Sequence, residues 1–204
     1  MHSILSKLVL LAGAITAATT AFAQHAPAGQ VGRRNLNFEV GTTFVFEYSR
    51  VAEINGNRFW PFGGSVDGAV TLWKGLGVAG DFSGIHATDI SNRVSLDKHS
   101  FMAGPRYNFN LLPHNDLRYH ATRGFAEALF GEVHAFNSLF PAPNKVKTSA
   151  TSFSMQVGGG VDVAVGYGFN FRPVDVYWVH SSLPNNADNI QNNFRIGLGA
   201  SFRK

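Results

Sequence analysis

The sequence predicts an all-β fold, an eight-stranded antiparallel up-and-down transmembrane β-barrel. Three observations favour it. Eight segments of about 9–12 residues, the length of a tilted strand that crosses a bilayer, alternate apolar and polar side chains at every second position. The connections between them alternate between long polar segments and tight turns, although the one at 110–122 is longer than a tight turn. Charged residues make up only 15% of the chain, less than in most water-soluble domains, while Gly and Phe number 22 and 18.

The N-terminus has the layout of a secretory signal peptide. Lys7 precedes a short apolar run, and Ala21 and Ala23 occupy the small positions of a cleavage site. The apolar run is shorter than the roughly 20 residues that a membrane-spanning helix needs. We therefore expect a signal peptide at residues 1–23, an N-terminal periplasmic segment at 24–35 and the barrel domain at 36–204.

Composition excludes several other classes. The chain has no cysteine, so disulfides do not stabilise it after export. Its formal net charge is +4, but the basic residues are scattered and form no stripe of the kind that binds nucleic acid. No histidines show the spacing of a metal site. We expect no nucleic-acid partner, no metal and no cofactor.

The alternation is clearest near the start of the predicted barrel. In the segment 36–49, one face carries Phe38, Val40, Thr42, Phe44, Phe46 and Tyr48. The opposite face is mostly polar, with Val45 as an exception. A similar pair of runs lies on either side of Lys74-Gly75, which predicts a hairpin with a tight turn. Residues 166–168 predict a second tight turn, and we expect long loops near 49–64, 86–99, 136–150 and 180–192.

Three of the predicted strands are irregular. Pro105 cannot donate to a ladder, so it must lie at a bulge or where pairing is interrupted. The run 124–135 contains good helix formers, but we interpret it as a strand with a bulge, because we expect the alternation to slip near Gly131. A slip at Arg172-Pro173 divides the seventh strand.

Alternation alone leaves a soluble, lipocalin-like barrel open as the alternative. In such a barrel the apolar face would point inward. The signal peptide and the low charge favour an apolar face that points outward to lipid. Aromatic rings at one set of predicted strand ends also favour it, since amphipathic rings gather at membrane interfaces. These residues are Trp73, Tyr107, Phe109, Tyr167, Phe169 and Phe202.

The chain resembles the small OmpA/OmpX-type eight-stranded outer-membrane proteins, and more narrowly the stand-alone barrels of soil bacteria. The stretches that carry the resemblance are GGSVDGAVTLWKGLGVAGDFSG, FMAGPRYNF, FAEALFGEVHA, SFSMQVGGGVDV, FRPVDVYW and QNNFRIGLGASF. The resemblance implies a monomer in the outer membrane of a Gram-negative-type bacterium, in contact with membrane lipid and lipopolysaccharide. The peptidoglycan-binding domain of large OmpA-type proteins is not expected here.

The C-terminal strand is similar to the signal that the barrel assembly machinery reads in such proteins. Its apolar positions are Phe194, Ile196, Leu198 and Phe202. The usual signal ends on the aromatic residue, whereas Arg203 and Lys204 follow Phe202 here.

The polar face predicts a charged barrel interior. An eight-stranded barrel is just wide enough for side chains to fill, and buried charges persist only when paired. We expect an interior charge network and a structural or surface-interaction role, with a narrow porin-like ion channel as the alternative. The expected members are Glu39, Glu47, Asp67, Asp81, Arg106, Glu127, Asp162, Asp175 and Arg195.

An enzyme is a second alternative, less favoured. Lipid A deacylases are also eight-stranded barrels, with a His-x-Ser pair near an outer strand end. His180 and Ser182 have that spacing, which places them on one strand face. The final strand contains no carboxylate to orient the histidine. We therefore expect no enzymatic activity.

Overall fold

The computed structural model describes one compact unit within Leu36–Lys204. The described residues are 36–50, 58–91, 94–112, 121–142, 145–185 and 189–204. The predicted signal peptide and the segment 24–35 lie outside them. Among the described residues, no helix is long and apolar enough to span a bilayer.

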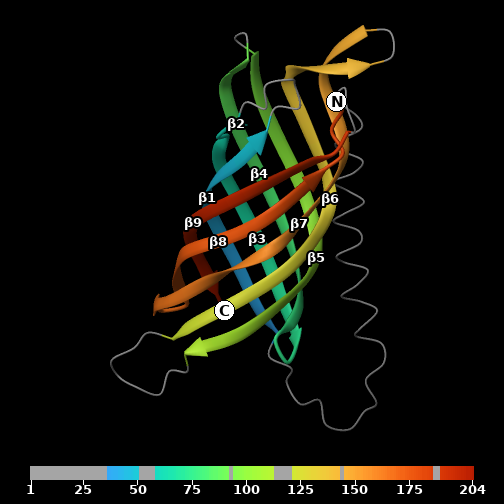
Figure 1. The fold of residues 1–204 in the computed structure, drawn as a ribbon. Helices are drawn as coiled ribbons and strands as arrows, with labels where there is room; N and C mark the ends of the chain where they lie inside the picture. The colour runs from blue at the N-terminus through green and yellow to red at the C-terminus, as the bar shows by residue number, and fades with distance from the viewer. Residues whose placement is uncertain (1–35, 51–57, 92–93, 113–120, 143–144, 186–188) are drawn as a thin grey trace, which may run out of the picture. The chain divides into compact units, whose positions relative to one another are not determined.

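Eight antiparallel strands form a closed ring, which confirms the predicted fold class (Figure 1). A ninth, two-residue strand, β2, pairs with the end of β1. The strands are β1 (Asn37–Arg50), β2 (Arg58–Phe59), β3 (Phe62–Trp73), β4 (Leu76–Ser91), β5 (Val94–Leu112), β6 (Thr122–Ala142), β7 (Lys145–Gly166), β8 (Phe169–Ser181) and β9 (Gln191–Arg203).

The ring closes between the first and last long strands. The β1–β9 ladder runs without a register shift from Glu39↔Arg203 to Tyr48↔Phe194. It continues to the last residue, because the amides and carbonyls of Phe38 and Lys204 exchange hydrogen bonds of 3.0 and 2.9 Å. Closure leaves neither of these strands with an open backbone edge along this length.

Side chains alternate between the two faces of the wall as the sequence predicts for β1. Phe38, Val40, Phe44 and Phe46 are exposed on the outside, while Val45 is fully buried inside. The other long strands follow the same pattern, with exposed Val, Leu and Phe outside and buried polar residues inside. The apolar face is therefore the outer face, which excludes the lipocalin-like arrangement.

Tight turns lie at one end of the barrel. Lys74 and Gly75 join β3 to β4 with φ of 45° and 88°, and Tyr167 and Gly168 join β7 to β8 with φ of 52° and 83°. Two successive positive φ angles fit a type I′ turn, whose twist matches that of the strands it connects. The exposed aromatic residues at this end are Trp73, Tyr107, Phe109, Tyr167, Phe169 and Phe202.

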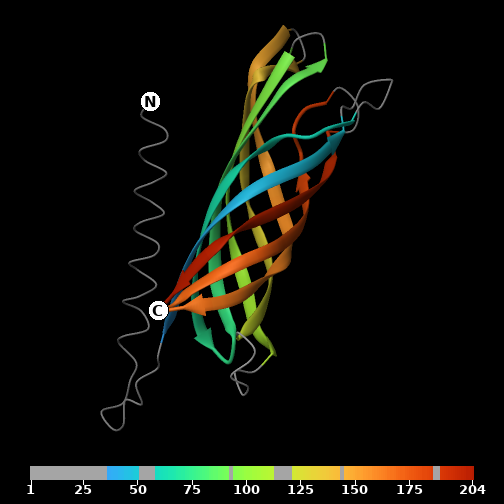
Figure 2. The same cartoon turned by 90° about the vertical axis from the view of Figure 1, so that its left-hand side faces the viewer.

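At the opposite end, two predicted long loops are mainly strand. The β4–β5 ladder extends to Ser91↔Val94, and the β6–β7 ladder extends to Ala142↔Lys145. These hairpins, drawn in green and in yellow to orange, rise above the rest of the wall in Figure 2. The prediction of loops at 86–99 and 136–150 was wrong. Paired strands that extend into water need no apolar outer face, so their sequence is polar and lacks the alternation that marks a strand.

The predicted phase slip and bulge near Gly131 were also wrong. The β6–β7 register is unbroken from Thr122 to Phe136, and Gly131 continues the inward face. Glu132 and His134 lie on the outside of the wall, where they follow the apolar Phe130. The alternation of inward and outward side chains continues here, but the outward residues become polar toward the hairpin end. The register shift of this strand lies further along, between Phe136 and Phe140.

The two proline-containing strands show two different irregularities. Pro105 pairs with Val78 on β4, while the β5–β6 pairing lapses between Ala103 and Arg106 without a change of register. Here the missing N–H interrupts a ladder and produces no bulge. In β8, by contrast, the register shifts between Arg172 and Asp175, at the predicted slip.

Arginine substitutions at two depths of the outer wall test whether this face contacts hydrocarbon. Leu198→Arg in the middle of β9 is expected to destabilise the barrel by about 2–4 kcal/mol in lipid, and Asn192→Arg near the hairpin end by about 0–1 kcal/mol. Urea unfolding in phospholipid vesicles measures both. Equal costs at the two positions would contradict a hydrocarbon-facing wall.

Candidate functional site

All nine charged residues predicted for the barrel interior are buried. Each occupies an inward position of its strand, so the ring brings together residues that are far apart in the sequence. They are Glu39, Glu47, Asp67, Asp81, Arg106, Glu127, Asp162, Asp175 and Arg195. Their side chains meet in three layers along the barrel axis.

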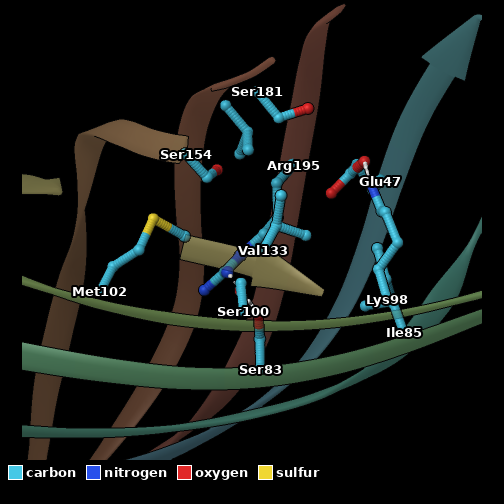
Figure 3. Close-up of a pocket in the computed structure, with 11 residues that line it drawn as sticks. Glu47, Ser83, Ile85, Lys98, Ser100, Met102, Val133, Ser154, Ser181 and Arg195 are labelled. Atoms are coloured by element: carbon cyan, nitrogen blue, oxygen red, sulfur yellow. Dashed lines mark hydrogen bonds and ion pairs between the residues drawn. The ribbon is translucent and has the colours of Figure 1, made fainter. Parts of the chain in front are cut away.

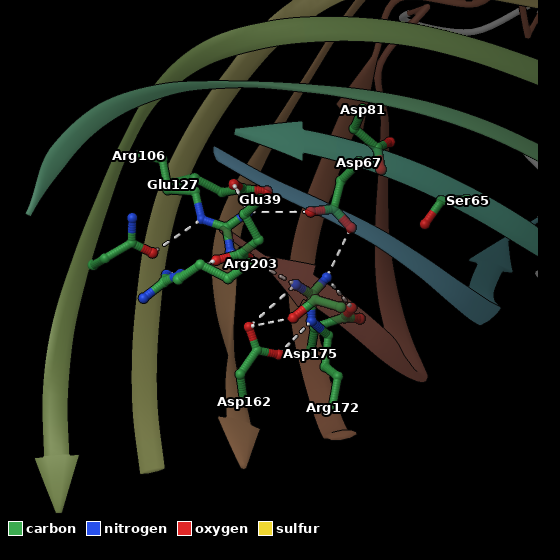
Figure 4. Close-up of polar contacts among 12 residues, drawn as sticks. Glu39, Ser65, Asp67, Asp81, Arg106, Glu127, Asp162, Arg172, Asp175 and Arg203 are labelled. Carbon is green, nitrogen blue, oxygen red and sulfur yellow. Dashed lines mark hydrogen bonds and ion pairs between the residues drawn. The ribbon is translucent and has the colours of Figure 1, made fainter. Parts of the chain in front are cut away.

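The first layer, nearest the tight turns, centres on Glu39 of β1 (Figure 4). The Arg106 side chain of β5 pairs with two carboxylates. Its Nη2 lies 2.5 Å from Glu39 Oε1, and its Nη1 lies 3.1 Å from Asp67 Oδ2 on β3. Two strands, β3 and β4, separate β1 from β5 in the ring. The Arg106–Glu39 pair therefore crosses the lumen instead of following the wall.

Sequence reasoning missed Arg172, which is 1% exposed and completes this layer. Its Nε lies 2.8 Å from Asp162 Oδ1, and its Nη1 lies 2.8 Å from Asp67 Oδ1. Its Nη2 also donates to Glu39 Oε1 over 3.3 Å. The signal was present, since Arg172 opposes Phe171 in the alternation, but the adjacent slip left its face unassigned.

Phe125 contacts both guanidinium groups of the first layer. The Arg106 Cζ is 3.8 Å and the Arg172 Cζ is 4.6 Å from the centre of its ring. Cation–π contact offsets part of the repulsion between the two like charges. The ring fits because Gly160 faces it, where an added Cβ would lie 2.8 Å from Phe125 Cζ.

The second layer is built on Arg195 of β9. Its Nη2 lies 3.2 Å from Asp81 Oδ2 on β4, and its Nη1 donates to Gln156 Oε1 on β7 over 3.1 Å. The guanidinium also lies 5.0 Å from the ring centre of Tyr177. The Tyr177 hydroxyl donates to Glu127 Oε1 over 2.8 Å, which connects β8 with β6.

The third layer contains Lys98, which sequence reasoning also missed. Its ammonium pairs with Glu47 across the lumen, from β5 to β1. Asn193 and Ser49 donate to the same Glu47 oxygen, each over 2.8 Å. The predicted loop at 86–99 had hidden Lys98, because no inward face was assigned to a segment that was not expected to be a strand.

A cavity of about 20 Å³ separates the second and third layers. Figure 3 shows Arg195 pointing into it, with Glu47 and Lys98 at one side. Hydroxyl groups of Ser83, Ser100 and Ser154 also line it. A space of this size holds about one water molecule.

An apolar cluster covers the layers at the hairpin end. Val133 and Ala135 of β6 pack with Phe140 and with Leu183, which follows β8. Leu183 is 1% exposed, so the segment after β8 turns back into the mouth of the barrel. The cluster borders the third layer, because Ala135 is opposite Lys98 in the β5–β6 ladder and Val133 lines the cavity.

The final strand places the predicted assembly signal on the outer wall. Phe194, Ile196, Leu198 and Phe202 are all exposed there. Arg203, the first residue after Phe202, points inward and joins the first layer. Its Nε donates to Glu39 Oε2 over 2.9 Å. The added basic residue therefore belongs to the interior network, and recognition by the assembly machinery stays a prediction.

His180 and Ser182 lie on the outside of the wall at the hairpin end. The His180 Nδ1 is 2.9 Å from Asn192 Oδ1, and its ring lies 5.7 Å from that of Trp178. Asn192 is the residue opposite His180 on β9. An amide therefore occupies the place from which a carboxylate would orient the histidine, and Asp175 lies inside the wall.

The sequence family agrees with this architecture. The family model described as "outer membrane protein beta-barrel domain" matches residues 9–202. The chain belongs to this family. Membership means a bacterial outer-membrane barrel, and the wall described above, apolar outside and charged inside, is the form that such a barrel needs.

Solved outer-membrane barrels have similar structures. Neisserial surface protein A is 14% identical, with 81% of this chain and 96% of that chain covered and a TM-score of 0.59. Ail, the attachment invasion locus protein of Yersinia pestis, is 17% identical, with coverage of 83% and 99% and a TM-score of 0.47. At 14% identity the likeness to Neisserial surface protein A supports the fold alone. No characterised sequence matches the chain.

Removing Arg172 tests the first layer. Arg172→Ala leaves Glu39, Asp67 and Asp162 short of a buried cation, so we expect a loss of about 3–5 kcal/mol of unfolding free energy. Arg203→Ala is the matched control. It removes a more exposed guanidinium from the same Glu39, and its loss is expected to be smaller. Urea unfolding in vesicles gives both values; a cost below about 1 kcal/mol for Arg172→Ala would show that the layer contributes little.

The deacylase alternative has a direct test. We expect the purified barrel to release no fatty acid from lipid A, because the partner of His180 is an amide and not a base-orienting carboxylate. Thin-layer chromatography of the lipid detects release. Release by the native protein that His180→Ala abolishes would overturn this expectation.

Proposed function

We propose that this protein is a non-conducting outer-membrane barrel with a structural or surface-interaction role. The observation that carries the proposal is the set of ion pairs that cross the lumen. Arg106–Glu39, Arg172–Asp67 and Arg195–Asp81 each join strands that are not neighbours in the ring. A path for ions would have to open every layer, and separating a buried pair costs several kcal/mol.

The outer apolar cluster supports the same proposal independently. Leu183 and Phe140 are buried at the mouth, so a hydrated ion would have to shed water to pass them. The cavity below holds about one water molecule. These features favour a plugged lumen over the narrow ion channel.

The extended hairpins favour a role at the cell surface. Short turns of outer-membrane barrels face the periplasm and long connections face outward. The β6–β7 hairpin therefore presents Leu139 and Val146 to the exterior, 62% and 61% exposed. Val146 is opposite Pro141 in the β6–β7 ladder, and strand pairing there reduces the ordering cost of a contact. Leu139 lies in the irregular stretch between Phe136 and Phe140. They suit a protein partner or the lipopolysaccharide layer.

Planar-bilayer recording tests the closed lumen. The native protein is expected to give no resolved current steps in concentrated potassium chloride, while a general porin in the same bilayer gives steps. Arg195→Ala is expected to stay silent too, because the first layer and the apolar cluster remain.

Two outcomes decide between the proposal and its alternative. Regular steps from folded native protein would establish the narrow channel and end the proposal. Silence from native protein and from Arg195→Ala supports closure by several layers. Folding is checked in each preparation by faster migration of unboiled protein on a detergent gel.

A further inference from the structure

Three outward histidines lie together at the hairpin end of the membrane wall. His86 of β4, His99 of β5 and His134 of β6 occupy neighbouring strands, and His99 is directly opposite His134 in the β5–β6 ladder. Phe136 contacts both of these rings, with centroid distances of 5.1 Å to His99 and 5.7 Å to His134. We call these three residues with Phe136 and the nearby Asp97 and Glu132 the histidine patch.

The patch lies at the depth of the outer headgroups. His99 is ten positions along β5 from Phe109 of the aromatic band at the turn end. At about 3.3 Å per residue and a tilt near 40°, this length spans about 25 Å, the height of the apolar band of an outer-membrane barrel. Between them the outward residues are Phe101, Ala103, Pro105 and Tyr107, none of them charged.

The hydrogen bonds of the patch direct its imidazoles. The Nδ1 of His86 lies 2.6 Å from Asp97 Oδ1, and the Nδ1 of His134 lies 2.7 Å from Thr151 Oγ1. In His86 and His134 the wall holds Nδ1, so Nε2 is the nitrogen that these two rings can turn to the lipid. The His99 ring instead lies with its Cδ2–Nε2 edge over Gly84 of β4. Phe136 can also stabilise protonated rings through its π face.

The charge of the patch changes sign with pH. Among the residues that the structure describes, the charged groups next to the imidazoles in the ladders are Asp97 on β5, opposite His86, and Glu132 on β6, two residues from His134. Asn137 donates to Asp97 over 2.6 Å and lowers the pKa of that carboxyl, which keeps it ionised in mild acid. Imidazoles gain their charge between about pH 5 and 8. The patch is therefore acidic when they are neutral, and three cations outnumber two carboxylates when they are protonated.

We propose that the histidine patch binds phosphate groups of the surrounding outer-leaflet lipid when its imidazoles are protonated. Charge complementarity selects this occupant, because the phosphates of the outer leaflet lie at the same depth as the patch and carry negative charge. Two protonated imidazoles placed opposite each other on β5 and β6 repel, and a phosphate anion beside them relieves that repulsion. No cluster of the described residues has the arrangement of a metal site, so a bridging metal is not invoked.

This inference rests on the outer-membrane barrel and adds to its proposed surface role a lipid contact that strengthens in acid. It is independent of the closed lumen. Loss of the lipid contact would leave the conductance result unchanged, and an open channel would leave the patch unchanged.

Lipid selectivity measures the contact. The protein is reconstituted in phosphatidylcholine with traces of spin-labelled phosphatidylglycerol or phosphatidylcholine, and electron spin resonance gives the relative association of the two labels. Phosphatidylglycerol keeps one negative charge across this pH range, so only the protein titrates. Its preference over phosphatidylcholine is expected to rise about threefold from pH 8 to pH 5.

Variants separate the patch from other groups. His86→Gln/His99→Gln/His134→Gln is expected to lose the rise, and the control His180→Gln, which removes an outward histidine away from the patch, is expected to keep most of it. All these side chains are on the outer surface, and gel migration checks folding. Should the triple variant not fold, His99→Gln/His134→Gln is measured instead. A flat native profile, or an unchanged rise in the patch variant, overturns the proposal.

Discussion

Closure of the backbone ladder is the constraint on which the rest of this structure depends. An unpaired peptide group in hydrocarbon costs several kcal/mol, so every strand that crosses the bilayer needs a partner on both sides. The β1–β9 ladder meets this need up to the last residue, where Phe38 and Lys204 exchange their hydrogen bonds. Once the ring is closed, alternate side chains must face either lipid or a narrow lumen. The apolar wall and the charged interior are both consequences of that division.

The interior shows how charged side chains can fill so small a space. Arg106, Arg172 and Arg195 each meet more than one acceptor, as Arg172 does with Asp162 and Asp67. Aromatic rings pack against the cations, and glycines make room for the rings, as Gly160 does for Phe125. Pairs that cross the lumen connect strands that share no ladder, so the network ties opposite sides of the wall together. A buried ion pair is weak evidence of stability by itself, but removal of one partner is costly. The network therefore favours a single packed interior over an open path.

The sequence predicted the closed eight-stranded ring and the burial of residues such as Glu39 and Arg195, because the two-residue period of a strand assigns each side chain to a face. It failed where that signal was masked. Lys98 was missed because a polar hairpin outside the bilayer has no apolar face to mark it as strand. Arg172 was missed because it lies at the slip beside Pro173, where the alternation changes phase, so it was assigned to neither face. Gly131 was misinterpreted because the outer surface turns polar at Glu132 and His134, which imitates a change of face.

By itself, the sequence determined the strand class, the number of strands in the ring and the two faces of the wall, since all three follow from local periodicity and from turn residues such as Lys74 and Gly75. Tertiary structure alone decided which charges meet. The partners Arg106 and Glu39 are on strands separated by two others, and only the closed ring sets their distance. It also decided that His99 faces His134 and that Leu183 covers the mouth of the lumen. Such pairings depend on the register between strands and on the curvature of the ring, which are properties of the assembled barrel and not of any one segment.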